Sequence, residues 1–183
     1  MQNSQSSQGV VARTKRLVLR KMIPEDLDDL YAVYQSWGVV EGVVPLSQDR
    51  EEEYEKLCSY IEWMYGFYGM GLWAVCLKDN GQMIGRCGAW PSEIMDSWLA
   101  ELGYIIHKAW CGQGYGIEAM EAGVDYIRGE TEFCERAAQI HKNNIPSIQL
   151  ARRLGMEIDP AGFQEKTQMC LYRMAICRDK HGR

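Results

Sequence analysis

The chain contains no run of about 18 apolar residues, the length that a membrane-spanning helix needs. Its first eight residues are polar and lack the apolar segment of a secretory signal. We therefore expect a cytoplasmic protein that has no membrane anchor.

Paired cysteines are also missing. The seven cysteines are widely spaced, and no two of them form a C-x-x-C pair. An odd number at wide spacing argues against a disulfide framework and a zinc ribbon, so we expect no metal site. Most lie in apolar stretches, where cysteine acts as a small core residue in a reducing compartment.

Positive charge is scarce, with 20 Lys and Arg against 25 Asp and Glu, giving a net charge of −5. Nucleic acid is disfavoured as a partner, because neutralising phosphates requires clustered Lys and Arg.

The densest run of charge is acidic, at Glu51, Glu52, Glu53 and Glu55. It fits a first helical turn, where carboxylates suit the helix dipole. The alternative is a local field that attracts a cationic substrate.

The 183 residues suit one domain with a substantial core. Apolar periodicity and turn residues predict its elements. They are a strand at 15–20, a helix from Pro24, a helix at 50–65, hairpin strands at 71–78 and 82–90, a strand at 98–107, a helix at 117–128, a strand at 136–141, a helix at 147–154 and a last strand at 168–177. This order predicts an α+β (mixed α/β) domain over residues 14–178, with a mixed sheet covered by helices. A disordered tail at 1–13 and a polar tail at 179–183 flank it.

Three glycines, Gly112, Gly114 and Gly116, directly precede an amphipathic helix. The first N–H groups of a helix have no partners within it, and the helix dipole there favours anions. Because glycine leaves these amides uncovered, a phosphate can reach them, and the turn predicts a phosphate or diphosphate site at 112–117. Taken by themselves, the three glycines are also explained by a tight turn that binds no ligand.

Two other phosphate motifs fit less well. No Gly-Lys-Ser/Thr follows, which excludes a Walker A loop. A dinucleotide-binding turn needs glycine or alanine at 119, and Ala119 with Glu135 further on keeps a nucleotide-binding oxidoreductase open as an alternative. Such folds usually begin with their glycine turn, however, whereas here 111 residues with antiparallel-looking hairpins come first.

Longer segments resemble the coenzyme-binding motif of the GNAT N-acetyltransferase superfamily, namely ELGYII at 101–106 and WCGQGYGIEA at 110–119. The chain is most similar to the branch containing ribosomal-protein alanine N-acetyltransferases. Asn144 and Ser147 match that branch's Asn-x-x-Ser element, and TKRLVLR at 14–20 matches its first strand. Cys111 replaces a frequent Gln or Arg, and Met156 a usual Phe. A tyrosine that serves as general acid in many other branches has no clear counterpart.

The resemblance implies a GNAT-like, mostly antiparallel twisted sheet that is splayed at its middle strands near Ile106 and His141. Acetyl-CoA would lie in the gap, with its pantetheine arm along residues 104–106 like an added strand. Turn amides would hold the diphosphate, Asn144 would bind near the sulfur, and Ser147 would lie beside the thiolate leaving group. The implied coenzyme-binding residues are Tyr104, Ile105, Ile106, Gly112, Gln113, Gly114, Gly116, Ile117 and Asn144.

The implied chemistry is attack of a neutral amine on a thioester. A lysine-like amine with a pKa of about 10.4 is rarely neutral at pH 7, whereas an α-amine with a pKa of about 7.7–8.0 is neutral in about one molecule in ten. Glu101, on the strand beside the gap, is the predicted base, acting through water, unless it is only a solvated strand residue. His107 is a rival near the phosphates, and His141 a more distant one. Ser147 is the predicted acid, or alternatively a helix cap.

The sequence thus predicts an N-acetyltransferase that moves an acetyl group from acetyl-CoA to a primary amine. The acceptor is either a protein N-terminal α-amine or a small-molecule amine. A non-catalytic acyl-CoA-binding domain of the same fold is an alternative, because an active and a silent pocket can share every glycine. The expected partners are acetyl-CoA and the acceptor, not nucleic acid or a membrane, and a homodimer stays open.

Overall fold

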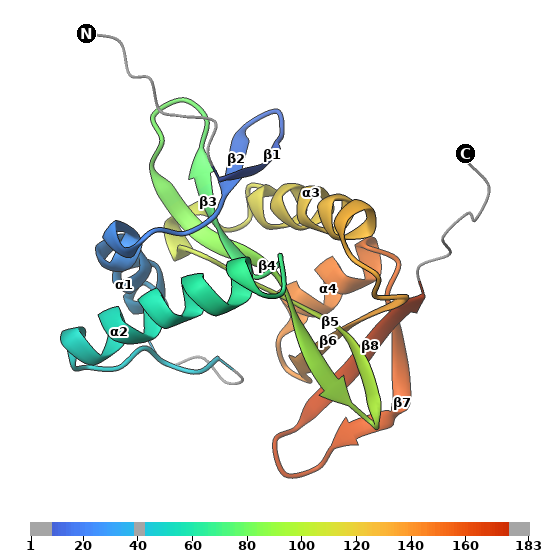
Figure 1. Ribbon diagram of the computed structural model, residues 1–183. Coiled ribbons are helices and arrows are strands. Elements are labelled where there is room, and N and C mark those ends of the chain that lie inside the picture. The colour runs from blue at the N-terminus through green and yellow to red at the C-terminus, as the bar shows by residue number, and fades with distance from the viewer. Residues whose placement is uncertain (1–8, 39–42, 176–183) are drawn as a thin grey trace, which may run out of the picture.

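An eight-stranded sheet forms the centre of the structure, a computed structural model that describes residues 9–38 and 43–175 (Figure 1). Its order is β1-β2-β3-β4-β5-β6-β8-β7, and all neighbours are antiparallel except β5 and β6, which run parallel. Within the described ranges the strands are β1 (Val10–Arg13), β2 (Leu17–Arg20), β3 (Leu72–Leu77), β4 (Met83–Ile94), β5 (Ser97–Ile106), β6 (Glu135–His141), β7 (Glu157–Gln164) and β8 (Met169–Ala175). The expectation of a mostly antiparallel sheet is confirmed.

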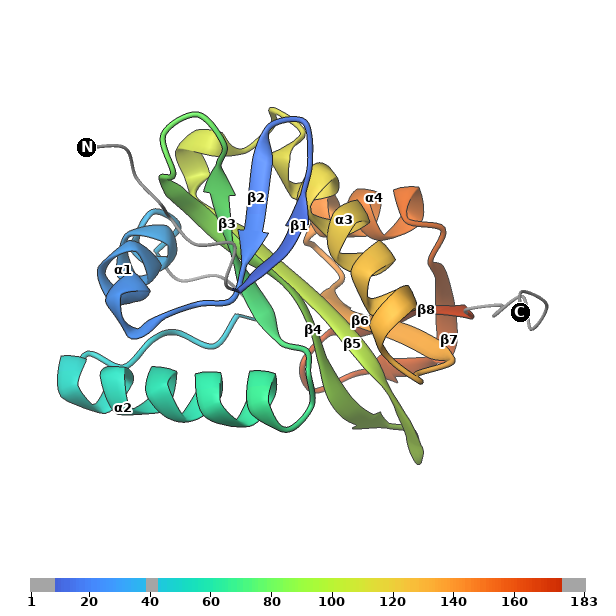
Figure 2. The same ribbon diagram turned by 45° about the horizontal axis from the view of Figure 1, so that its top comes forward.

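Helices cover both faces of this sheet (Figure 2). One face carries α1 (Leu27–Gln35) and α2 (Arg50–Tyr60), and the other carries α3 (Tyr115–Glu130) and α4 (Ile145–Arg153). Short 3₁₀ turns precede α1 at Pro24–Asp26 and α3 at Lys108–Trp110, and a π-helical turn extends α2 over Ile61–Tyr65. No helix in the described part of the chain has the length and apolar character to cross a membrane.

The sheet face under α3 packs around Trp73 of β3, which is fully buried. Its indole meets the ring of Tyr126 edge to face, with 5.2 Å between the ring centroids. Gly123 lies against the same indole, because a Cβ at this position would come within 3.3 Å of it. The apolar residues of α3 that face the sheet recur at three- and four-residue spacing and are Ala119, Met120, Val124 and Ile127. This packing fixes the position of α3, and with it the glycine turn at its start.

The link from β2 into α1 is held by a partly buried ion pair. Arg20 donates two hydrogen bonds of 2.7 Å to the carboxylate of Asp26, which is 4% exposed. The same carboxylate accepts the main-chain N–H of Ile23, one residue before Pro24 opens the helical turn. The predicted helix start at Pro24 is confirmed, since proline suits the first helical position.

The middle of the sheet is splayed. β5 pairs with β4 along its whole length, and β6 pairs with β8 along its whole length. Between β5 and β6, in contrast, the register contains only Ala100 opposite Arg136 and Glu101 opposite Ala137. The two strands separate directly after Glu101, so a gap opens through the sheet there and continues toward Ile106 and His141.

The N-terminal boundary needs a correction. β1 falls within residues 1–13, which the sequence analysis assigned to a disordered tail, so that prediction is wrong for Val10–Arg13. The short segment VVAR does not alternate apolar and polar residues, and its register with β2 shifts between Val10 and Ala12. Residues 1–8, residues 176–178 of the predicted domain and the predicted tail at 179–183 lie outside the described residues.

Candidate active site

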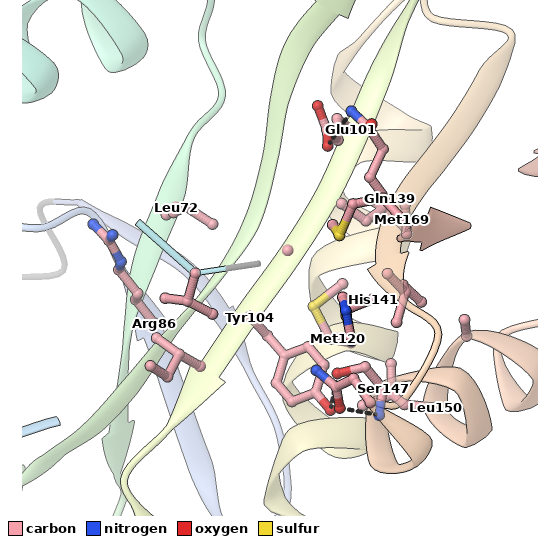
Figure 3. A pocket seen from close by; sticks show the side chains of 18 of the residues that line it. Leu72, Arg86, Glu101, Tyr104, Met120, Gln139, His141, Ser147, Leu150 and Met169 are labelled. Carbon is pink, nitrogen blue, oxygen red and sulfur yellow. Dashed lines mark hydrogen bonds between the residues drawn. The ribbon is translucent and has the colours of Figure 1, made fainter. Parts of the chain in front are cut away.

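A cavity of about 370 Å³ lies at the splay, and residues of β4, β5, β6 and α4 line it (Figure 3). Successive side chains of a strand point to opposite faces of the sheet. On β5, Glu101 therefore shares one face with Gly103, while Tyr104 points to the other, where α3 and α4 lie. The cavity thus has a wall on each face of the sheet.

The main chain of β5 offers free hydrogen-bonding groups to the gap. The N–H of His107 donates to the carbonyl of Ile84 on β4, at 2.7 Å. Because main-chain groups alternate in direction along a strand, those of Ile105 also point to β4, whereas those of Leu102 and Tyr104 point into the gap. The carbonyl of Ile106 accepts Nε1–H of Trp37 at 2.7 Å. Of the predicted stretch 104–106, Tyr104 is thus the residue best placed to pair with a pantetheine arm. The carbonyl of Leu102 joins it, whereas the N–H of Leu102 belongs to the last bridge between β5 and β6.

The glycine turn at the start of α3 is open. Gly112 has a φ of +75° and Gly114 a φ of +82°, a left-handed conformation that glycine adopts without strain. Gly114 is the N-cap of α3, and no side-chain hydrogen bond caps the helix there. A Cβ at Gly112 would meet no atom within 4 Å. The first amides of α3, at Tyr115, Gly116 and Ile117, therefore keep the features expected of an anion site.

A cluster of polar side chains from the turn between β1 and β2 braces the glycine turn. Arg16 donates through Nη1 to the carbonyl of Gln113 at 2.9 Å and through Nε to Glu118 at 2.6 Å. Its guanidinium also stacks on the ring of Tyr115, 4.1 Å from the ring centroid. Thr14 donates its hydroxyl to Glu118 at 2.6 Å. Burial alone raises the pKa of Glu118, but these bonds from Thr14 and Arg16 hold it below its ordinary value of 4.5.

Glu118→Gln is expected to show how much this brace contributes. Since the pKa of Glu118 is lower in the folded state, its carboxylate stabilises the fold above pH 4.5, and that contribution disappears as the pH falls through the folded-state pKa. At pH 7 the variant should lose about 1 kcal/mol of unfolding free energy, measured by urea denaturation. The deficit should shrink below about pH 4. Glu121→Gln, at an exposed site on the same helix, is the control, and a deficit independent of pH would contradict this role.

Asn144 and Ser147 meet at the start of α4. The Oδ1 atom of Asn144 accepts the main-chain N–H of Ser147 at 3.2 Å, so Asn144 rather than Ser147 is the N-cap. The freed hydroxyl of Ser147 donates to the phenol oxygen of Tyr104 across the gap, at 3.2 Å. Burial raises the pKa of Tyr104 while the bond from Ser147 lowers it, with a net rise. Tyr104 is among the residues expected to bind the coenzyme, but the contact of its phenol with Ser147 joins residues 43 positions apart, so no local pattern indicates it.

Glu101 is nearly buried, at 9% exposure, and lines the cavity. It accepts one hydrogen bond from Nε2 of Gln139 at 3.2 Å, and Oε1 of Gln139 accepts in turn from Gln164 of β7 at 2.7 Å. No described lysine or arginine forms an ion pair with Glu101. A carboxylate held by neutral amides at the edge of a cavity is suited to accept a proton or to bind an ammonium group.

Trp90 lies on β4 directly opposite Glu101 and lines the same cavity. Its ring covers Gly103, where a Cβ would come within 2.7 Å of the indole. Glycine at 103 therefore allows the indole to lie across β5.

The two histidines have different surroundings. His107 caps the turn before α3, where its Nδ1 accepts the N–H of Ala109 at 3.1 Å, and it does not line the cavity. His141 lines the cavity and accepts the N–H of Asn143 through Nδ1 at 3.3 Å. The geometry gives His107 a structural role, whereas Glu101 and His141 both line the cavity.

The acidic run at 51–55 lies in the first turns of α2, as expected if these carboxylates serve the start of a helix. Asp49 caps this helix by accepting the N–H groups of Glu51 and Glu52. Glu53 accepts the N–H of Ser47 at 2.8 Å, and Glu52 pairs with Lys56 at 2.6 Å. None of the four glutamates lines the cavity at the splay. Their contacts favour the role in the helix over attraction of a substrate.

A family model described as an acetyltransferase (GNAT) domain matches residues 16–157. This match covers well over half of the chain, which therefore belongs to the GNAT family of acetyltransferases. The resemblance seen in the sequence, and the fold that it implied, are confirmed.

Individual proteins agree with this assignment. The chain is 37% identical over 89 residues to the uncharacterized protein YkkB of Bacillus subtilis (strain 168), covering 49% of this chain and about half (52%) of that relative. Its structure is similar to an acetyltransferase from Agrobacterium tumefaciens str. C58, with a TM-score of 0.72, 24% identity, and coverage of 96% of this chain and 99% of that one. It is also similar to RimL, a ribosomal L7/L12 alpha-N-protein acetyltransferase in complex with coenzyme A, with a TM-score of 0.71, 15% identity, and coverage of 91% and 98%. At these identities the structural likeness establishes the fold.

Proposed function

We propose that the chain transfers an acetyl group from acetyl-CoA to a primary amine, either a protein N-terminal α-amine or a small-molecule amine. The observation that carries this proposal is the cavity at the splay, which the nearly buried carboxylate of Glu101 and the ring of Tyr104 line. The uncapped start of α3 lies next to it, because a Cβ at Gly116 would come within 3.2 Å of that ring. The complex of the structurally similar RimL with coenzyme A agrees with a coenzyme site in this fold.

In the proposed complex, the diphosphate of acetyl-CoA accepts hydrogen bonds from the amides of the glycine turn, at Gly112, Gln113, Gly114, Gly116 and Ile117. The helix dipole favours this negative charge. The pantetheine arm pairs with the gap-facing main chain of β5 at Leu102 and Tyr104, as an added strand does. Because Oδ1 of Asn144 is used in capping α4, its Nδ2 group is the donor left for the arm near the sulfur.

The acceptor reaches the thioester from the face of Glu101 and Trp90. Glu101 takes a proton from the ammonium form, directly or through water, and the neutral nitrogen then attacks the acetyl carbonyl carbon. The tetrahedral intermediate loses its second nitrogen proton to water and collapses to an amide as the carbon–sulfur bond breaks. The thiolate leaves with the electron pair and takes a proton from Ser147, which is supplied in turn through Tyr104 or water. Each turnover yields one amide, one thiol and one proton.

Ser147→Ala is expected to lower kcat by tenfold or less, roughly, because a thiolate with an ordinary pKa of about 8.5 leaves readily without an acid. The dissociation constant for acetyl-CoA should change little. Thiol release under saturating substrates measures kcat, and Ser59→Ala on the exposed side of α2 is the matched control. A loss of a thousandfold would give Ser147 a larger role than this account assigns to it.

A direct test of the proposed function uses purified protein, acetyl-CoA and a panel of amines. Amine-dependent thiol release, with acetylated product identified by mass spectrometry, would support transfer. The panel should include peptides with free and blocked N-termini as well as small amines. Tight coenzyme binding with no amine-dependent release would instead indicate a non-catalytic acyl-CoA-binding domain.

A further inference from the structure

A cation faces the acceptor side of the cavity without an anionic partner. Arg86 of β4 lines the cavity, and no described Asp or Glu forms an ion pair with it. Its Nη2 group donates to the phenol of Tyr34 on α1, while its Nε atom is buried and has no hydrogen-bond partner among the described residues. A buried guanidinium N–H group is normally hydrogen-bonded, so half-buried Arg86 has unused capacity for an anion.

The surroundings of Arg86 are aromatic and neutral. The guanidinium lies 5.0 Å from the ring centroid of Tyr34. It is also close to two further phenols: burial raises the pKa of Tyr60 and of Tyr65, and the positive charge of Arg86 opposes both rises. An anion entering here would meet one positive charge and no described carboxylate in contact with it. A cationic group would be repelled.

Arg86 and Glu101 lie on the same face of the sheet, well apart in Figure 3. Arg86 is opposite Ile105 and Trp90 is opposite Glu101, so four residues of strand, ~13 Å, separate the two positions. Allowing for the reach of the side chains, an acceptor that spans the cavity would hold its two ends on the order of 10 Å apart. An α-amino acid is too short for this span, because its amine and carboxylate are attached to the same carbon.

We propose that the acceptor carries an anionic group, a carboxylate or phosphate, which Arg86 binds while the amine lies on the order of 10 Å away beside Glu101. This inference rests on the proposed function. It fits two sources of the same chemistry, an acidic side chain one or two residues into an extended peptide or a long ω-amino acid. The opposite class of acceptor, a polyamine, is disfavoured by the same charge.

The test uses matched acceptors that differ only in the anion. One arm compares 8-aminooctanoate with its amide, and the other compares peptides with Asp or Asn at the third position. We expect kcat/KM to be roughly tenfold or more higher for the acid than for the neutral partner in at least one arm, with most of the difference in KM. Moving the Asp to position 6 should remove the preference. The arm that shows the preference identifies the source, and rising salt should weaken it.

In Arg86→Gln, the ratio of kcat/KM for the acid to kcat/KM for the neutral acceptor should fall to about one. Arg86→Lys should retain part of the preference. Arg128→Gln, at an exposed site on α3, is the control and should behave as the wild type does. Titration calorimetry with acetyl-CoA checks that the coenzyme site is intact in each variant. If Arg86→Gln does not fold, the comparison of acceptors with the wild-type protein still decides the question.

Equal rates for acid and neutral acceptors would show that this inference is wrong while transfer itself stands, and Arg86 would then serve only to pack against its tyrosines. If no amine is acetylated, the proposed function fails separately. The affinities of the acid and its amide for the coenzyme-loaded protein, measured by calorimetry, still test the anion site in that case, and equal affinities would overturn it.

Discussion

Gly114→Trp should raise the dissociation constant for acetyl-CoA by more than about a hundredfold, or about 2.7 kcal/mol, the largest effect expected of any single change. Gly114 is the N-cap of α3 and precedes the amides proposed to bind the diphosphate. An indole at this position would occupy the space that the phosphate oxygens need. Titration calorimetry with acetyl-CoA measures the loss.

Backbone strain is the competing explanation, because a residue with a side chain is disfavoured at the φ of +82° found at Gly114. Gly81→Trp is a matched control, since Gly81 has a φ of +75°, lies in the β3–β4 hairpin and has open space around its Cβ position. It should lose a similar amount of stability, about 1–2 kcal/mol, and bind the coenzyme normally. If Gly114→Trp folds and binds acetyl-CoA as the wild type does, the phosphate assignment is wrong.

Glu101→Gln should slow acetylation of lysine-like amines by about a hundredfold and of α-amines by about tenfold. The difference follows from the acceptor, because an amine with a pKa of about 10.4 depends on a base far more than one with a pKa of about 7.7–8.0. Glutamine has nearly the shape of glutamate and can still accept the hydrogen bond from Gln139, so the fold should be kept.

The measurement is kcat/KM for a matched pair of amines across pH 6–10. In the variant, the rate should recover as the pH approaches the pKa of the acceptor, where the neutral amine is abundant without a base. Glu93→Gln, an exposed carboxylate on β4, is the control. Equal slowing of both amines at every pH would argue that Glu101 binds or orients the acceptor and does not act as a base.

Local signals in the sequence were sufficient for most elements. The Asn80-Gly81 pair predicts the β3–β4 hairpin because that dipeptide favours the tight turn which joins two strands, and the hairpin is present. Apolar spacing predicts α3, which the structure extends by two residues at each end, to Tyr115–Glu130. These features depend on residues that are close together in the sequence, so a short sequence pattern is enough to predict them.

The strands that were missed lack such a pattern. β7, with sequence EIDPAGFQ, is largely exposed and contains Pro160, which usually argues against a strand. It forms the edge of the sheet, where a proline without an N–H group is tolerated, and its register with β8 shifts between Asp159 and Gln164. Its existence depends on pairing with β8, which the residues of β7 alone do not indicate.

The residues of the site also fall into two groups, those that a local pattern indicates and those that only the folded structure shows. The glycine turn, Glu101 and Asn144 could be selected from the sequence because each stands in a local motif. The partners that set their chemistry come from distant segments: Gln139 of β6 donates a hydrogen bond to Glu101, and Arg16, in the turn between β1 and β2, braces the glycine turn. Arg86 gave no signal in the sequence, because only the assembled sheet shows that it faces the cavity without an anion.

The most direct test of the account is a crystal structure of the protein with acetyl-CoA. We expect the diphosphate oxygens within hydrogen-bonding distance, about 2.7–3.2 Å, of main-chain amides between Gly112 and Ile117. The pantetheine arm should run along β5 at Leu102 and Tyr104, with the thioester between Glu101 and Ser147. Coenzyme bound at another surface, with the glycine turn left empty, would contradict the account.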